Sequence, residues 1–137
     1  MKKVVATIAL RVMIIGSTIM MIFQLSLALG APLGHAAWGG MYNVLPKNLR
    51  AESFFSAFLF FCGIIVFRGR AGKLSHPPSL LFFRLGSILL ALMFSISALL
   101  NLVSYSAWER YLMAPIALLL AICGWIIVGV SHKQSTN

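Results

Sequence analysis

The chain has 137 residues, of which 61% are hydrophobic and only 9% are charged. A soluble domain usually carries about 25% charged residues and keeps much of its surface in water. This composition therefore excludes an ordinary soluble domain and indicates one small membrane domain over residues 1–137. The formal net charge of +9 would suggest nucleic-acid binding in a soluble protein. Here the basic residues separate apolar runs, which favours topology signals and contacts with membrane lipids, and no nucleic-acid partner is expected.

Residues 4–29 form the first apolar run. A membrane-spanning helix needs about 20 residues, so we expect a helix at about residues 8–30. A signal peptide is the alternative, because Ala28-Leu29-Gly30 offers small residues at cleavage-like spacing. The run is much longer than a hydrophobic signal region of about 7–15 residues, which favours an uncleaved helix.

Residues 31–50 are rich in glycine and proline and also carry apolar side chains. This mixture predicts an outer loop that packs on the helix ends as a compact cap. Residues 51–67 are the second predicted helix, with Glu52 in its first turn, where an acid suits the positive end of the helix dipole. Cys62 lies inside this helix and Cys123 inside the last one, and neither belongs to a CxxC motif. Neither a disulfide framework nor a zinc site is expected.

Residues 68–84 form a basic turn, 85–103 the third helix, 104–113 a second outer loop and 114–130 the fourth helix. Pro115 would lie in the first turn of the last helix, where proline is tolerated. The expected fold is all-α, a four-helix transmembrane bundle with short loops. Four spans place both termini on one side of the membrane.

The distribution of basic residues predicts which side that is. Eight lie in the N-terminal segment, residues 68–84 and the C-terminal tail, and three lie in the two other loops. The positive-inside rule then places both termini in the cytoplasm and the loops 31–50 and 104–113 outside. The eight are Lys2, Lys3, Arg11, Arg68, Arg70, Lys73, Arg84 and Lys133, and the three are Lys47, Arg50 and Arg110.

The outward face would hold both acids of the chain and most groups able to hydrogen-bond, titrate or stack. We expect a pocket there whose walls are Trp38 and Trp108. The candidate ligand-binding residues are His35, Trp38, Tyr42, Asn101, Trp108, Glu109 and Arg110. The alternative is structural: tryptophan and tyrosine anchor helices at membrane interfaces, and Glu109 could pair with Arg110, Arg50 or Lys47.

His35 and Glu109 could also form an acid–base pair. No nucleophile with a recognisable sequence context accompanies them, so no catalytic residue is assigned. The three histidines and two acids are scattered over both predicted sides of the membrane, which makes a poor metal site. No metal or other cofactor is expected.

The first loop reads GAPLGHAAWGG over residues 30–40, Leu45-Pro46 follows it, and a Trp108-Glu109-Arg110 triplet precedes the last predicted helix. With these motifs nearly the whole chain resembles a group of small four-helix bacterial integral membrane proteins that are usually left uncharacterised. Members of that group often have an aromatic residue where this chain has Leu33. The resemblance implies a bacterial cytoplasmic membrane and four helices, and it implies no activity. A looser similarity to DoxX-like membrane proteins rests on size and topology alone.

Three hypotheses about function follow. The leading one is binding, or help in handling, of a lipid or small amphipathic molecule at the outward face. The alternative is an accessory or structural subunit, with a membrane protein or a second copy as partner. A membrane enzyme that uses His35 and Glu109 is the third.

Overall fold

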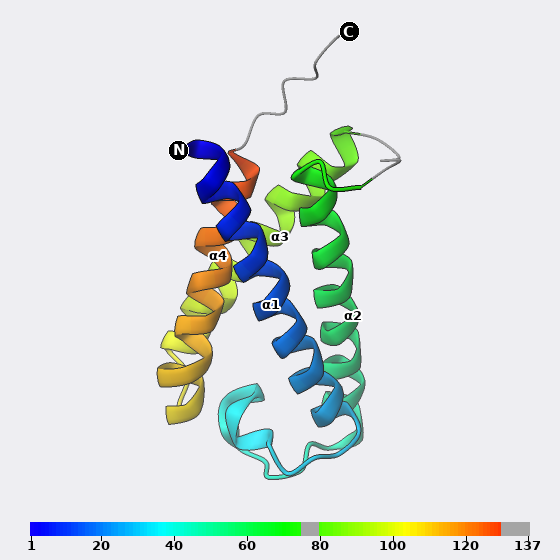
Figure 1. Ribbon diagram of the computed structural model, residues 1–137. Coiled ribbons are helices and arrows are strands. Elements are labelled where there is room, and N and C mark those ends of the chain that lie inside the picture. Colours follow the sequence, from blue (N-terminus) through cyan, green and yellow to red (C-terminus); the bar gives the residue numbers. More distant parts are fainter. Residues whose placement is uncertain (75–79, 130–137) are drawn as a thin grey trace, which may run out of the picture.

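The computed structural model describes residues 1–74 and 80–129. Within these residues it contains four long helices (Figure 1). The helices are α1 (Lys2–Ala28), α2 (Lys47–Arg70), α3 (Leu80–Leu102) and α4 (Ala114–Val128), and the π-helical turn η3 (Glu109–Met113) leads directly into α4. Each of α1, α2, α3 and the continuous segment from η3 through α4 is long and apolar enough to cross a membrane. The predicted four-helix transmembrane bundle is confirmed, and the chain is a multi-pass membrane protein.

The second helix begins earlier than the sequence suggested. Pro46 is extended, with φ −65° and ψ 161°, and the first helical turn starts at Lys47. Proline commonly precedes or opens a helix because its missing N–H needs no partner there. Glu52 consequently lies in the second turn, so its predicted place in the first turn is wrong.

The predicted loop 104–113 is largely helical. Residues 107–108 are α-helical, and the π-helical turn Glu109–Met113 joins them to α4. Pro115 explains this turn, because proline has no N–H to give to the carbonyl four residues earlier and its ring collides with that carbonyl. The wider π-turn relieves the collision, and the Ala114 N–H bonds to Glu109 O, five residues back.

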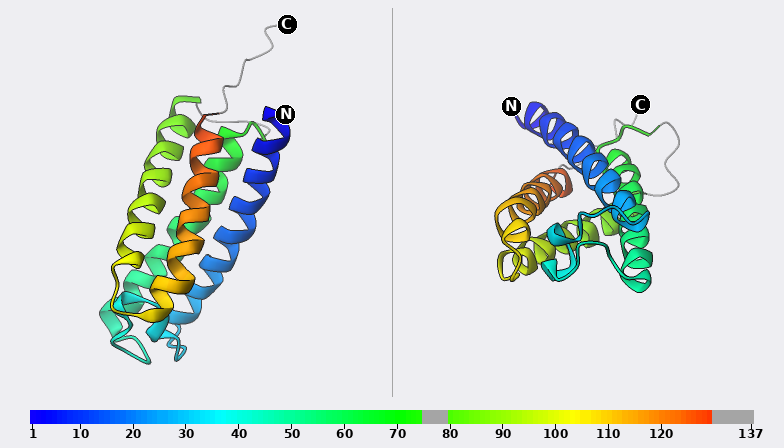
Figure 2. Two further views of the ribbon diagram at one scale, coloured as in Figure 1. Left: turned by 90° about the vertical axis from the view of Figure 1, so that its left-hand side faces the viewer. Right: turned by 90° about the horizontal axis from the view of Figure 1, so that it is seen from below.

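The helices are not arranged as a regular square. The α1–α2 and α3–α4 pairs make the most extensive interfaces, α1 also packs on α4, and the α2–α3 interface is smaller. Figures 1 and 2 show that α3 starts beside the end of α2 and finishes beside the start of α4. The main core includes the fully buried Met13 and Phe67 with Leu120 and Ile127. It lies in the half of the bundle that contains the N-terminus.

Glycine allows α2 and α3 to approach closely at the end where the N-terminus and the last turn of α4 lie. A Cβ on Gly69 would fall 2.3 Å from the Phe83 ring, and a Cβ on Gly86 would fall 3.2 Å from Val66. Toward the other end the contacts between these helices involve large side chains, such as the Phe60–Phe94 stack with ring centroids 5.8 Å apart. The two helices therefore diverge toward the loop end of the bundle, where the segment between α1 and α2 lies (Figure 2).

Candidate functional site

The segment between α1 and α2, residues 31–46, folds back against the open end of the bundle and is called the cap here. Its Gly34 N–H donates to Asn43 O at 2.9 Å, which closes the segment into a compact loop. Ala37 and Leu45 of the cap pack with Leu27 in a small core separate from the main one. The Arg50 guanidinium donates through Nε to Ala28 O at 2.9 Å and so ties the end of α1 to α2. The cap is fixed by both packing and hydrogen bonds.

Three consecutive cap residues have a left-handed backbone: Trp38 (φ +55°), Gly39 (φ +80°) and Gly40 (φ +71°). Glycine adopts this conformation freely, but a bulky aromatic residue does so rarely and at a cost of about 1–2 kcal/mol. The Trp38 indole N–H donates to the hydroxyl of the fully buried Ser53 on α2 at 2.9 Å. This bond helps to hold the strained residue, and strain of this kind tends to occur at functional sites.

Glu109 holds the cap from the opposite side. Its Oε1 accepts a hydrogen bond from the Gly39 N–H at 2.8 Å, although 70 residues separate the two in sequence. The Ser106 hydroxyl donates to His35 O and accepts from the Glu109 N–H at 3.3 Å. The left-handed Gly39 and the π-turn that carries Glu109 thus face each other across the open end of the bundle.

A cavity of about 490 Å³ lies between the cap and helices α1, α2 and α3. Its size is in the usual range for small-molecule sites, about 300–1,000 Å³. Most of its wall is apolar, with rings from α1, α2 and α3 and with methionines. The lining residues are Met20, Phe23, Gln24, Ala36, Ala37, Trp38, Gly39, Ser56, Leu59, Phe60, Leu90, Met93, Phe94, Ile96, Ser97, Leu100, Asn101, Glu109 and Met113.

Similarity to known proteins does not indicate what this cavity binds. Comparisons with protein-family models, curated proteins and solved structures find no match. Among the described residues no group of three metal-ligating side chains comes together, and Cys62 and Cys123 are free thiols.

Five polar side chains line the otherwise apolar wall: Gln24, Ser56, Ser97, Asn101 and Glu109. The Ser56 hydroxyl donates to Glu52 O within its own helix, at 2.9 Å. Gln24 Oε1 is buried and has no hydrogen-bond partner within the described part of the chain. An unsatisfied buried oxygen costs about 1–3 kcal/mol, so this atom marks a place where a donor from a bound molecule would be favourable.

Three of the residues predicted as ligand contacts line the cavity: Trp38, Asn101 and Glu109. The other four, His35, Tyr42, Trp108 and Arg110, do not. Trp108 is 61% exposed, so its predicted place as the second wall, packed near Trp38, is wrong. It immediately precedes Glu109 in a helical segment, where neighbouring side chains point in directions about 100° apart. Glu109 points into the bundle, and Trp108 consequently points out of it.

The pairings predicted around Glu109 are also absent. Within the described residues Glu109 makes no ion pair, and its partner is the Gly39 N–H. His35 is exposed, and its Nδ1 lies 3.1 Å from Gly40 O, so it does not contact Glu109. Arg110 lies over the ring of Tyr111, with 5.7 Å from Cζ to the ring centroid. The geometry gives no acid–base pair of His35 and Glu109.

The candidate residues taken from the sequence do not include Gln24, Ser56 and Ser97. Gln24 and Ser97 are polar residues in apolar helices, and such residues more often bond a neighbouring helix. Only the divergence of α2 from α3 shows that these positions border a cavity. A polar residue in an apolar helix is unusual, but only the arrangement of the helices shows that Gln24 and Ser97 line a cavity.

Proposed function

We propose that this protein binds a lipid or small amphipathic molecule in the cavity beneath its cap and helps to handle that molecule in the membrane. The observation that carries the proposal is the 490 Å³ cavity, with its apolar wall and its few polar groups near the cap. Small-molecule sites typically combine a mostly apolar wall with a few placed polar groups.

The length of the cavity supports an acyl-chain ligand. Its lining on α3 runs from Leu90 to Asn101, and eleven residues at 1.5 Å each span about 16 Å. This is about half of the hydrocarbon thickness of a bilayer, which is about 30 Å. A chain bound along α3 would therefore reach from the cap to about the middle of the membrane, as a lipid chain in one leaflet does.

The same side of the cavity supports entry from the bilayer. Met93, Ile96 and Leu100 line the cavity and are also exposed on the surface of α3. They lie where α2 and α3 diverge, so a chain can move between lipid and cavity without passing through the cap. Water entry across the cap is not needed for this route.

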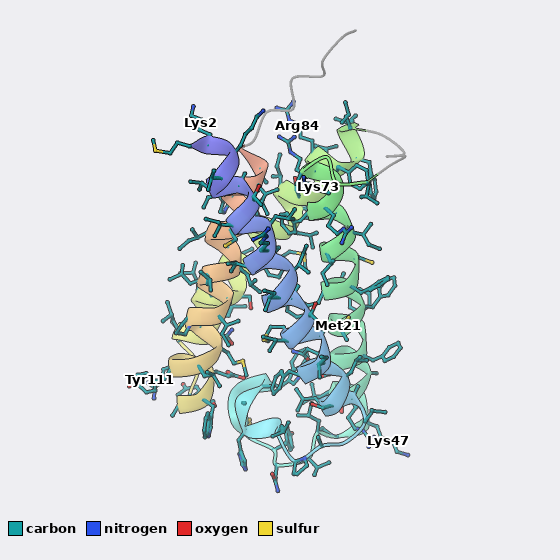
Figure 3. The ribbon with its side chains drawn as sticks, viewed as in Figure 1. Lys2, Met21, Lys47, Lys73, Arg84 and Tyr111 are labelled. Carbon is teal, nitrogen blue, oxygen red and sulfur yellow. The ribbon has the colours of Figure 1, made fainter. Side chains whose placement is uncertain are left out.

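We further propose that the membrane is the cytoplasmic membrane of a bacterium, with both termini inside and the cap outside. The support is the excess of basic residues at one end of the bundle. Figure 3 shows Lys2, Lys73 and Arg84 at the end that holds the N-terminus, and Lys47 at the cap end. A reporter that works only in the cytoplasm, fused after Asn137, is expected to be active, and an inactive reporter would reverse the orientation.

Two substitutions on α3 test the binding proposal. Ser97→Phe adds a ring inside the cavity, because Ser97 lines it. Leu99→Phe adds a ring on the same helix at a position that is 64% exposed and outside the lining. Each variant and the unmodified protein are purified in mild detergent, and the small molecules that leave the membrane with them are identified by mass spectrometry.

The proposal expects a defined molecule with the unmodified protein and with the Leu99→Phe variant, and its loss from the Ser97→Phe variant. The same lipid mixture in all three samples would contradict it. Recovery of a second membrane protein in fixed proportion, with no small molecule, would instead favour the accessory-subunit hypothesis.

A further inference from the structure

The charge and hydrogen-bonding character of the cavity wall restrict the head group that it can accept. This inference rests on the proposed function, because it concerns the same cavity. No lysine, arginine or histidine is among the residues that line it, and the one charged residue there is Glu109. The wall therefore offers no cation to a phosphate or carboxylate head group.

Glu109 is nearly buried, with 5% of its surface exposed. Gly39 N–H binds its Oε1, while Oε2 has no hydrogen-bond partner within residues 1–74 and 80–129. No cationic side chain of the described residues forms an ion pair with it, and the Gly39 N–H is the one hydrogen-bond donor to its carboxylate among these residues. A charge in an apolar site is costly unless it is paired and hydrogen-bonded.

Gln24 adds a second acceptor from α1. Its Oε1 is buried without a partner in the described part of the chain, and the residue lines the same cavity as Glu109. A glutamine oxygen and a carboxylate both accept hydrogen bonds and cannot donate them. The Glu109 carboxylate is therefore satisfied only by an N–H or O–H group, and Gln24 can accept from the same group through Oε1.

Aromatic rings complete the environment. Trp38, Phe23 and Phe60 line the cavity with the two acceptors. The face of an aromatic ring attracts a cation, tryptophan most strongly. An anion receives no such attraction, and it would also be repelled by the Glu109 carboxylate.

We propose that the ligand of this cavity is a cationic amphiphile: a single apolar chain or ring system that ends in a protonated amine. The ammonium donates to Glu109 and Gln24 near the cap and neutralises the Glu109 charge. The apolar part lies along α3 toward Leu90. Anionic amphiphiles such as fatty acids meet no cation in this wall and are repelled by the Glu109 carboxylate.

Three probes with the same chain test this head-group preference: dodecylamine, dodecanol and dodecanoic acid. The whole protein is placed in phosphatidylcholine nanodiscs, each probe is titrated at matched membrane concentration, and the shift of the unfolding temperature gives an apparent affinity. Dodecylamine is expected to bind best, with an apparent affinity about tenfold above that of dodecanol, since hydrogen bonds to charged groups are the stronger ones. Dodecanoic acid is expected to give no shift.

The two acids of the chain provide matched variants. Glu109→Gln keeps an oxygen for the Gly39 N–H but removes the charge, and is expected to reduce the dodecylamine affinity to about that of dodecanol. Glu52→Gln changes the other acid, which is exposed and does not line the cavity, and should leave all three affinities unchanged. The ranking of the three apparent affinities of the unmodified protein tests the head-group preference even where a variant does not fold.

The outcomes separate the two proposals. Equal binding of the three probes, or a preference for dodecanol or dodecanoic acid, overturns the cationic head group and leaves lipid binding in place. A dodecylamine preference that persists in the Glu109→Gln variant also overturns it. Absence of any shift with all three probes contradicts the proposed function itself.

Discussion

The cavity exists because α2 and α3 approach closely at one end, and the substitution Gly69→Ala tests that approach. A Cβ on Gly69 would lie 2.3–2.6 Å from three atoms of the Phe83 ring. Both residues are buried, Phe83 with 2% of its surface exposed, so the ring cannot simply move into the lipid. Overpacking of this kind costs about 1–3 kcal/mol. Alanine stabilises a helix relative to glycine by about 0.5–1 kcal/mol, which leaves a net loss of up to about 2.5 kcal/mol.

Gly63→Ala on the same helix is the matched control. Its Cβ would lie 3.8 Å from Leu90, an ordinary contact. This variant therefore gains the helix stabilisation of alanine over glycine without the steric cost. The difference between the two variants should therefore be the full steric cost of about 1–3 kcal/mol. Reversible unfolding in mixed micelles of mild detergent and dodecyl sulfate measures both free energies of unfolding. Equal stability of the two variants would refute the close approach of α2 and α3.

Two further substitutions test the cap. Ser53→Ala removes the acceptor of the Trp38 indole N–H and should lower the free energy of unfolding by about 0.5–1.5 kcal/mol, the usual net contribution of one hydrogen bond. Gly40→Ala forces a left-handed alanine and places its Cβ 2.7 Å from the Cβ of Ser106. The backbone term alone is about 1–2 kcal/mol, and the collision adds to it.

Each of these variants has a neighbour that serves as its control. Ser56→Ala removes a hydroxyl that bonds only within its own helix, and is expected to change stability by no more than about 0.5 kcal/mol. Gly39→Ala has the same left-handed backbone cost but open space around the new Cβ, so it should be less harmful than Gly40→Ala. If each variant equals its control in the same unfolding assay, the cap contacts do not hold the loop as described.

The four helices could be predicted because each is an apolar run of membrane-spanning length with loop residues beside it. Helix ends were less predictable, since Lys47 and Asn48 are polar yet helical. Polar residues suit the ends of a membrane helix, so composition places the boundary at the edge of the apolar run and misses the polar first turn of α2. The π-turn at Glu109 follows from Pro115, but periodicity alone does not reveal a turn with a different repeat.

The candidate site could be predicted only in part. The acids and aromatic residues indicated the correct end of the bundle, and Trp38, Asn101 and Glu109 line the cavity there. The predicted position of Trp108 in the cavity wall was wrong because the sequence alone does not show which side of a short helical segment faces the bundle. Gln24 and Ser97 line a cavity only because α2 and α3 diverge. The angle between these helices depends on contacts of Gly69 and Gly86 with residues distant in sequence.

Native mass spectrometry of the unmodified protein, released from mild detergent, tests the central claim most directly. Lipid binding in the cavity predicts a complex of one chain with one small molecule of discrete mass, which survives removal of loosely bound lipid. The Ser97→Phe variant should appear as the bare chain under the same conditions. Detection of the bare chain alone for the unmodified protein, or of the same ladder of lipid adducts for both proteins, would contradict the claim.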